Sequence, residues 1–272
     1  MFSSSGLVWG LVPWSPGSSV VACRPNNAAR TGDQLLTSSN GRSDRGTVRS
    51  HNEDAFLDDP TNRLWAVADG MGGHAAGDVA SKAVVRHLTA VVRPPLTADY
   101  LDRIDDALAA ANSELLDYAR EHKLQLVGST AAVLIDAGHY MLCGWAGDSR
   151  VYQHAGGGLR MLTVDHNQAR EMRAAGTFTD TQIESSPQSA ALVRAVGAEK
   201  ELIVEWTLAD VAPHDLFLLC SDGVTKEMTD AEIAGALARP GPVEDIAATL
   251  VQTCLERGAR DNITVVVVRI DG

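Results

Sequence analysis

Aspartates that end apolar segments are the residues in this sequence whose types and spacing could support chemistry. Three apolar runs each lead into an aspartate that is followed by a small residue. These aspartates are Asp69, Asp148 and Asp222. A fourth, Asp261, stands in an Asp-Asn pair just before the last apolar run. Taken singly, each has an ordinary explanation, because an aspartate followed by a small residue commonly marks a turn.

The four aspartates taken together indicate a metal site. If the segments that they flank meet at one rim of the fold, their carboxylates would repel one another unless cations lay between them. Oxygen ligands suit hard ions such as Mg²⁺ and Mn²⁺. The sequence has no cysteine and histidine ligands at the spacing of a zinc site, so zinc is disfavoured.

The composition excludes some functions. The chain has 272 residues, 35 of them acidic and 23 basic, and a formal net charge of -12. So acidic a protein is a poor candidate for binding nucleic acid, which also argues against a metal-dependent nuclease. No segment of the sequence is long and apolar enough to span a bilayer. Its four cysteines include no Cys-x-x-Cys pair and favour a reducing compartment, so we expect a cytoplasmic protein.

A different chemistry is suggested by Cys254 and Arg260, which have the Cys-x₅-Arg spacing of phosphatases with a thiolate nucleophile. That chemistry needs the cysteine in a glycine-rich phosphate loop, where its pKa is lowered. Cys254 falls instead on the apolar stripe of an expected helix, so we interpret it as a core residue. The Ser129-Thr130 pair has no base partner visible in the sequence and is expected to pack or bond locally.

The elements that must position these residues begin after a polar N-terminal stretch. Residues 1–40 are rich in Ser, Gly, Pro and Asn without apolar periodicity, and we expect a disordered extension there. The folded domain is expected to span residues 41–272. Strands are predicted at residues 46–48, 54–57 and 64–68. Helices are predicted around 79–91 and 101–118, where apolar residues recur every three or four positions.

The second half of the chain changes to the period of strands. Strands are predicted at residues 130–135, 140–146, 150–154, 159–162, 203–206, 215–220 and 264–270. A helix is expected to start at Asp165, and residues 176–189 are expected to form a mobile flap. Thr229 and Glu232 form a capping box for one helix, and Pro242 lies in the first turn of the last helix.

Short turns between consecutive strands favour antiparallel pairing. The arrangement that buries this much apolar surface is two packed sheets with helices outside them. The expected fold class is therefore α+β, a four-layer α/β/β/α sandwich of two mainly antiparallel sheets flanked by helix pairs.

The order of the motifs along the chain resembles the metal-dependent protein phosphatases, the PPM family of type 2C. The matching runs are Arg49-Ser50-His51-Asn52-Glu53-Asp54, Ala68-Asp69-Gly70-Met71-Gly72-Gly73-His74, Gly128-Ser129-Thr130, Gly147-Asp148-Ser149-Arg150, Ser221-Asp222-Gly223 and Asp261-Asn262. The resemblance extends from about Gly41 to the C-terminus. The Met-Gly-Gly-His form is similar to the bacterial branch of the family.

The resemblance implies the metal ligands. Asp69 would bridge two Mn²⁺ or Mg²⁺ ions, and the carbonyl group of Gly70 would complete one coordination sphere. Asp222 and Asp261 would ligate the other ion.

The resemblance also implies the remaining site residues. Glu53 and Asp54 would hold waters bound to the metal ions. Arg49 would bind the substrate phosphate, for which a guanidinium group is suited. Asp148, together with Asp222, would offer a third and weaker metal position.

The implied activity is hydrolysis of phosphoserine and phosphothreonine on proteins. A water or hydroxide that bridges the two metal ions would attack phosphorus directly, without a phosphoenzyme. The implied partners are phosphorylated proteins and a bacterial serine/threonine kinase that the enzyme opposes. We expect a monomer that binds neither nucleic acid nor a membrane.

Two positions depart from the family pattern. Met71 stands where some members have a histidine that acts as general acid, so His74 is the catalytic candidate, with a turn-capping hydrogen bond as the alternative role. Lys226 stands where members often have an acidic residue, so a third ion is expected to bind weakly or not at all. A phosphatase-like domain without turnover is disfavoured, because the principal metal positions and Arg49 are filled.

Overall fold

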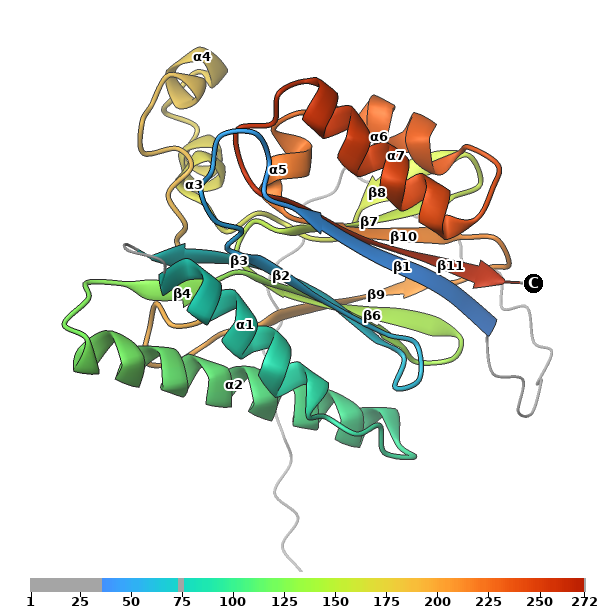
Figure 1. The fold of residues 1–272 in the computed structure, drawn as a ribbon, viewed down its shortest axis with the longest axis horizontal. Coiled ribbons are helices and arrows are strands. Elements are labelled where there is room, and N and C mark those ends of the chain that lie inside the picture. Colours follow the sequence, from blue (N-terminus) through green and yellow to red (C-terminus); the bar gives the residue numbers. More distant parts are fainter. Residues whose placement is uncertain (1–35, 73–75, 272) are drawn as a thin grey trace, which may run out of the picture. The chain divides into compact units, whose positions relative to one another are not determined.

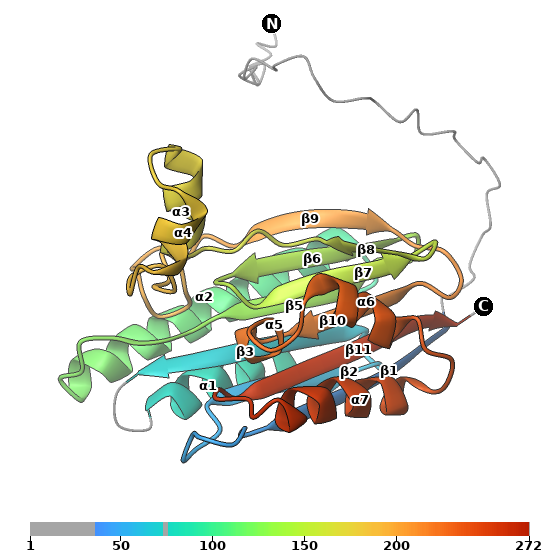
Figure 2. The same ribbon diagram turned by 90° about the horizontal axis from the view of Figure 1, so that it is seen from above.

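Two antiparallel sheets lie face to face with helices on their outer sides. The computed structural model describes residues 36–72 and 76–271. Figure 1 shows helices covering the outer side of each sheet, and Figure 2 shows the same elements from above. The predicted α/β/β/α sandwich is confirmed, and the strands in the described residues pair antiparallel throughout. No helix in the two described ranges is long and apolar enough to cross a membrane.

The first sheet has five strands. In spatial order they are β1 (Leu36–Asp44), β11 (Ile263–Asp271), β10 (Leu216–Cys220), β7 (Arg150–Ala155) and β8 (Gly158–Met161). The most apolar strand, β11, lies between β1 and β10, as its almost continuously buried residues require.

The second sheet has six strands. In spatial order they are β2 (Asp54–Asp59), β3 (Leu64–Gly72), β5 (Ala131–Asp136), β6 (Tyr140–Ala146) and β9 (Glu205–Asp210), and β4 (Val127–Ser129) pairs with the end of β3.

The helices fall into three groups. On the second sheet lie α1 (Ala76–Thr89) and α2 (Thr97–Glu121), and on the first lie α5 (Asp222–Thr225), α6 (Asp230–Leu237) and α7 (Val243–Glu256). The remaining two, α3 (Gln168–Ala175) and α4 (Asp180–Glu184), stand at one end of the sandwich (Figure 1). The predicted capping box of Thr229 and Glu232 is present at the start of α6.

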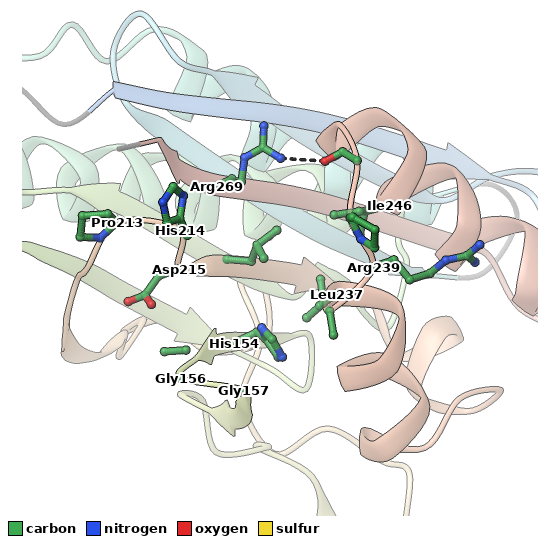
Figure 3. Close-up of a pocket in the computed structure, with 15 residues that line it drawn as sticks. His154, Gly156, Gly157, Pro213, His214, Asp215, Leu237, Arg239, Ile246 and Arg269 are labelled. Carbon is green, nitrogen blue, oxygen red and sulfur yellow. Dashed lines mark hydrogen bonds between the residues drawn. The ribbon is translucent and has the colours of Figure 1, made fainter.

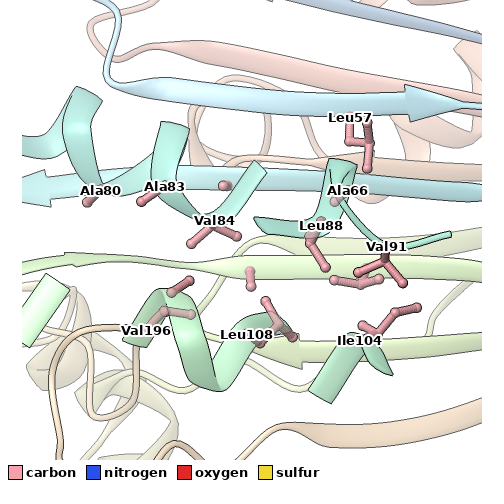
Figure 4. Close-up of a cluster of buried hydrophobic side chains, with 14 of the residues drawn as sticks. Leu57, Ala66, Ala80, Ala83, Val84, Leu88, Val91, Ile104, Leu108 and Val196 are labelled. Carbon is pink, nitrogen blue, oxygen red and sulfur yellow. The ribbon is translucent and has the colours of Figure 1, made fainter. Parts of the chain in front are cut away.

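Alternation along the strands divides the apolar residues into three cores. In β3, Leu64, Ala66 and Ala68 pack under α1 and α2, while Trp65 and Val67 face the other sheet. The outer core under α1 and α2 is drawn in Figure 4, where Val84 and Leu108 come from the two helices. A corresponding core lies between α6, α7 and the first sheet. The three cores fix the strands whose ends carry the aspartates.

The start of the fold differs from the prediction. Residues 36–40 were predicted to be disordered and the folded domain to begin at Gly41, but both lie in β1, which starts at Leu36. Residues 46–48 form a turn and not the predicted strand. No residue of β1 is fully buried, because it is an edge strand held by backbone pairing with β11. Serine, asparagine and glycine are therefore tolerated, and they hide the strand from a pattern of apolar residues. The predicted disorder of residues 1–35 lies outside the described residues.

Three other boundaries were misplaced. The strand predicted at 203–206 is β9, Glu205–Asp210, because alternate residues of this edge strand face outward. The cap of α3 is Asn167, whose side chain accepts a hydrogen bond from the Arg170 amide, whereas Asp165 pairs with Arg150. Pro242 is the N-cap of α7 and precedes its first turn. The segment predicted as a flap contains the short helix α4.

Asn112 connects α2 to the chain that leads into β9, and its replacement by alanine should destabilise the fold. The buried Asn112 Oδ1 accepts a hydrogen bond of 2.6 Å from the Gly197 amide, and Nδ2 donates one of 2.9 Å to the Glu199 carbonyl. Asn112→Ala removes both, and we expect the free energy of unfolding to fall by about 1–3 kcal/mol in urea titrations. The exposed neighbour supplies the control, Ser113→Ala. An Asn112→Ala protein as stable as this control would contradict the assignment.

Candidate active site

Pairing within the second sheet places two aspartates opposite each other. Asp54 begins β2 and Asp69 lies near the end of β3, and the two are direct register partners. The Asp69 amide donates a hydrogen bond of 2.9 Å to Thr130 Oγ1, and the Thr130 amide donates one of 2.9 Å to the Asp69 carbonyl. Thr130 therefore holds the backbone of Asp69 through both its amide and its carbonyl group.

Pairing within the first sheet places the other aspartates at the same end. The last residue of β10, Cys220, pairs with Val265 near the start of β11, so Asp222 and Asp261 flank that end. At Gly223 a Cβ atom would lie 1.9 Å from the Asn262 carbonyl oxygen, so the two backbones approach too closely for any side chain.

A hydrogen bond from Ser221, which follows β10, reaches the other sheet at this end. Ser221 Oγ donates to Asp54 Oδ2 at 2.7 Å, and both side chains are buried. Ser221 Oγ also accepts a hydrogen bond of 3.0 Å from the Thr264 amide. The hydroxyl group is therefore oriented by β11 toward a carboxylate of the other sheet.

A hollow of about 590 Å³ opens where these strand ends meet. Seven of the predicted site residues line it: Arg49, Glu53, Asp69, Gly70, Asp148, Asp222 and Asp261. Asp54 is buried next to them, opposite Asp69. Met71 and Lys226 also belong to the lining. His74 lies outside the described residues.

The segment that carries Arg49 and Glu53 is held by Asn262. Its Nδ2 group donates to the carbonyl oxygens of Arg45 and His51, at 2.9 and 3.0 Å, and its Oδ1 accepts from the Glu53 amide at 2.8 Å. Three contacts from one side chain thus shape the loop between β1 and β2 around the hollow.

Burial and mutual repulsion raise the pKa values of the aspartates of the second sheet. The pKa of Asp69 lies well above its usual value, because the group is buried and because Asp54, Asp222, Asp148 and Asp261 surround it. Burial raises the pKa of Asp54 to about 6, although hydrogen bonds from Thr264 and Ser221 partly offset it.

The pKa values of the remaining aspartates depend on burial and on how closely each one approaches a basic side chain. Burial, and then repulsion from Asp222, raise the pKa of Asp148 to about 7. Burial likewise raises the pKa of Asp222, against the opposing charge of Lys226. Burial alone would raise the pKa of Asp261, but Lys226 and Arg49 outweigh it and the pKa is lowered. The cluster therefore has more negative charge than its two basic neighbours offset.

The donor set fits hard divalent ions. All the acidic ligands are carboxylates, and Asp54 Oδ1 and Asp222 Oδ1 are buried without a hydrogen-bond partner in the described residues. A buried carboxylate oxygen without a hydrogen-bond donor would be stabilised by a bound cation. Yet within the same residues no three histidine, cysteine, aspartate or glutamate side chains are placed closely enough to hold one ion. Lys226 contacts both Asp222 and Asp261, so this pair is closed around an ammonium group.

Three residues of the site were not assigned a role from the sequence: Thr130, Ser221 and Asn262. Ser221 and Asn262 each stand next to an aspartate in one of the motifs, and Thr130 ends the motif Gly128-Ser129-Thr130, so their positions were the available signal. The expectation that Ser129-Thr130 bonds locally holds only for Ser129 Oγ, which donates to the Thr130 carbonyl at 2.8 Å. Both residues also bond to Asp69, about 60 residues away, and this was not predicted. The ion pairs of Lys226 were also missed, although Asp222 lies four residues before it, and the pair with Asp261 depends on how α5 meets β11.

The thiolate alternative is contradicted by the environment of Cys254. The side chain is fully buried in α7, and burial raises the pKa of its thiol to about 11. A nucleophilic cysteine needs the opposite shift.

A second hollow of about 340 Å³ lies at the opposite end of β10 from Asp222 (Figure 3). His154, His214 and Arg269 line it, and Arg269 donates a hydrogen bond of 2.8 Å to the Gly241 carbonyl. Its lining includes one carboxylate, Asp215, which accepts a hydrogen bond from Gln153. It therefore lacks the clustered acids of the first hollow.

Removing one charge from the cluster should stabilise the metal-free protein. Asp69→Asn removes a buried carboxylate that four others repel, so we expect the free energy of unfolding to rise by about 1–2 kcal/mol near neutral pH in the presence of a chelator. Thermal unfolding measures this change. Asp117→Asn, on the exposed side of α2, is the charge control. A metal-free Asp69→Asn protein that melts below the wild type would contradict the assigned repulsion.

The stabilisation by Asp148→Asn should depend on pH. The folded-state pKa of about 7 lies above the ordinary aspartate value, so the folded protein retains a proton that the unfolded chain releases near pH 4. The contribution of Asp148 to the free energy of unfolding of the wild type therefore decreases as the pH rises from about 4 to about 7. With a chelator present, the melting temperature of Asp148→Asn minus that of the wild type should grow over this interval. A constant difference would refute the raised pKa.

Comparisons with known proteins agree with this arrangement. A family profile described as Protein phosphatase 2C matches residues 41–266. The serine/threonine protein phosphatase PstP of Mycobacterium tuberculosis is 37% identical over 228 residues, which are 83% of this chain and 43% of that protein. The serine/threonine phosphatase stp of Listeria innocua is 33% identical over 235 residues, 84% of this chain and 93% of that protein. The chain thus spans less than half the length of the mycobacterial relative.

A solved structure extends the similarity to three dimensions. The catalytic domain of the serine/threonine protein phosphatase PstP, in complex with 2 manganese ions, superposes with a TM-score of 0.77 and 34% sequence identity. The match covers 88% of this chain and 100% of that one. From its sandwich fold, its ordered motifs and these similarities, the chain belongs to the protein phosphatase 2C family.

Proposed function

We propose that the chain is a metal-dependent protein phosphatase that hydrolyses phosphoserine and phosphothreonine. The observation that carries this proposal is the cluster of buried carboxylates in a hollow that also contains Arg49. Carboxylates alone would repel a phosphate dianion, so the hollow can accept one only with cations present. Relatives named serine/threonine phosphatases, and one solved with 2 manganese ions, support the same reaction.

Two divalent ions, Mn²⁺ or Mg²⁺, are proposed as the cofactors. The residues proposed to hold them are Asp69, the carbonyl group of Gly70, Asp222 and Asp261, with Glu53 and Asp54 as outer partners and Asp148 beside a third, weaker position. When bound, such ions act as Lewis acids that make water a stronger nucleophile and offset the charge of the phosphoryl oxygens.

Arg49 is proposed to bind the substrate phosphate. Its side chain is 51% exposed, and its guanidinium group lies 2.8 Å from Asp261 Oδ1, so the group is oriented in an accessible position. Asn262 holds the backbone of this loop through Arg45 and His51. A positioned guanidinium fork can bind two phosphoryl oxygens at once and thus hold phosphorus over the carboxylate cluster.

The leaving serine or threonine oxygen needs a proton. Met71 lines the hollow and has no proton to donate. His74 remains the proposed donor, with a turn-capping hydrogen bond as its alternative role.

The proposed substrates are phosphorylated proteins, and a cognate serine/threonine kinase is the proposed counterpart. Leu192 and Val193 line the hollow on the side of the chain that follows α4, so this side is suited to an apolar residue beside the phosphorylated one. A monomer is proposed, because all the site residues come from one chain.

The proposed cytoplasmic location fits the free cysteines Cys143, Cys220 and Cys254.

The reaction class is tested by release of phosphate from a phosphothreonine peptide. We expect turnover with added Mn²⁺, its loss with a chelator, and its return when Mn²⁺ is restored. The variants Asp69→Asn and Asp222→Asn should abolish turnover while the fold is retained, because an amide cannot offset the charge of the ions. Asp117→Asn serves as the matched control. Near-normal activity of both site variants at saturating Mn²⁺ would refute the assignment.

The role of Arg49 has its own test. Arg49→Ala should lower kcat/KM by about 10- to 100-fold, which corresponds to the loss of hydrogen bonds to a charged group. Arg49→Lys should restore only part of this loss, since an ammonium group cannot form the same fork. A folded wild-type protein that binds Mn²⁺ and releases no phosphate from any phosphopeptide would instead indicate a binding domain without turnover.

A further inference from the structure

Lys226 contacts two of the proposed metal ligands at once. Its Nζ atom lies 2.5 Å from Asp222 Oδ2 and 2.8 Å from Asp261 Oδ2. The two carboxylates come from different elements, since Asp222 begins α5 and Asp261 precedes β11. The ammonium group is therefore the cation that joins them.

The contacts occupy most of the oxygens of this pair. Asp261 Oδ1 lies 2.8 Å from Arg49 Nη2, so both oxygens of Asp261 contact basic groups. Asp222 uses Oδ2 for Lys226 and keeps only Oδ1 without a partner in the described residues. An ion that binds between Asp222 and Asp261 must therefore displace Lys226.

The surroundings distinguish this ion pair from one on the surface. Lys82 and Asp78 have the same separation of four residues in α1, but the Lys82 side chain is 65% exposed and the pair lies outside the hollow. Lys226 lines the hollow and is 46% exposed, and the side chains of Asp222 and Asp261 are 22% and 21% exposed, against 30% for Asp78. Partial burial reduces screening by water, so the contacts of Lys226 are harder to exchange.

We propose that Lys226 is a built-in counter-cation that competes with a divalent ion for Asp222 and Asp261. This inference rests on the proposed function, because it assumes that these carboxylates bind metal. In the metal-free protein Lys226 offsets part of the cluster's negative charge. When an ion binds, two ion pairs must be broken first, so the affinity at this position is weaker than the carboxylates alone would give.

The competition is tested by calorimetric titration of the full chain with Mn²⁺. Lys226→Met keeps the length and apolar character of the side chain and removes its charge. We expect the weaker of the Mn²⁺ affinities to increase at least about tenfold, which is 1.4 kcal/mol. Lys82→Met removes the matching pair in α1 and should leave all Mn²⁺ affinities unchanged.

Thermal unfolding gives a second readout that does not depend on activity. With a chelator, Lys226→Met should melt below the wild type, because the cluster has lost a counter-charge. With saturating Mn²⁺ this difference should vanish or reverse, since tighter binding stabilises the folded state. Lys226→Gln, with a smaller polar side chain, should behave in the same way.

The outcomes separate this inference from the proposed function. Suppose that a chelator removes the phosphatase activity of the wild type. Unchanged or weaker Mn²⁺ binding by Lys226→Met would then overturn the competition alone. A wild-type protein and a Lys226→Met protein that both bind no Mn²⁺ would overturn the metal site and the competition together.

Discussion

Repulsion among buried carboxylates is the constraint on which the rest of this structure depends. Asp54, Asp69, Asp148 and Asp222 share one end of the sandwich, and the pKa of each is raised because it is buried among other negative charges. Nothing local favours that arrangement. It persists because the strands that carry the aspartates are fixed by three apolar cores, which lie between and outside the sheets. The fold thus supplies the free energy that holds the like charges together.

Neutral groups set the geometry of the cluster and basic groups set its charge. Thr130, Ser221 and Asn262 orient the backbone of Asp69, the carboxylate of Asp54 and the loop of Arg49 through hydrogen bonds that carry no net charge. Arg49 and Lys226 then offset part of the remaining negative charge. Because both basic groups contact Asp261, that carboxylate alone among the proposed ligands has a lowered pKa. The cluster is therefore uneven in charge, with its cations gathered on the side of the first sheet.

Much of this arrangement could be predicted from the sequence, because buried strands and aspartates have strong local signals. The apolar runs that end in Asp69, Asp148 and Asp222 are strands or lead out of strands, and the structure gathers them at one hollow. The edge strands β1 and β9 were missed or misplaced, since backbone pairing with a neighbour, and not apolar side chains, holds β1 in place. Lys226 could be noted as a departure from the family, and Asp222 lies four residues before it, but its contact with Asp261 joins segments 35 residues apart. Such pairings depend on tertiary structure, which no local pattern contains.

The hydrogen bond from Ser221 to Asp54 crosses from one sheet to the other, and this has a mechanical consequence. At this end of the sandwich the two sheets are joined by polar contacts as well as by the apolar core between them. An ion shared by Asp69 of one sheet and Asp222 beside the other would act as a cross-link between the layers. Separation of the sheets at this end and release of the ion would then be one event. Slow amide hydrogen exchange in the flanking parts of β3 and β10 would therefore report on the ligand as well as on the fold.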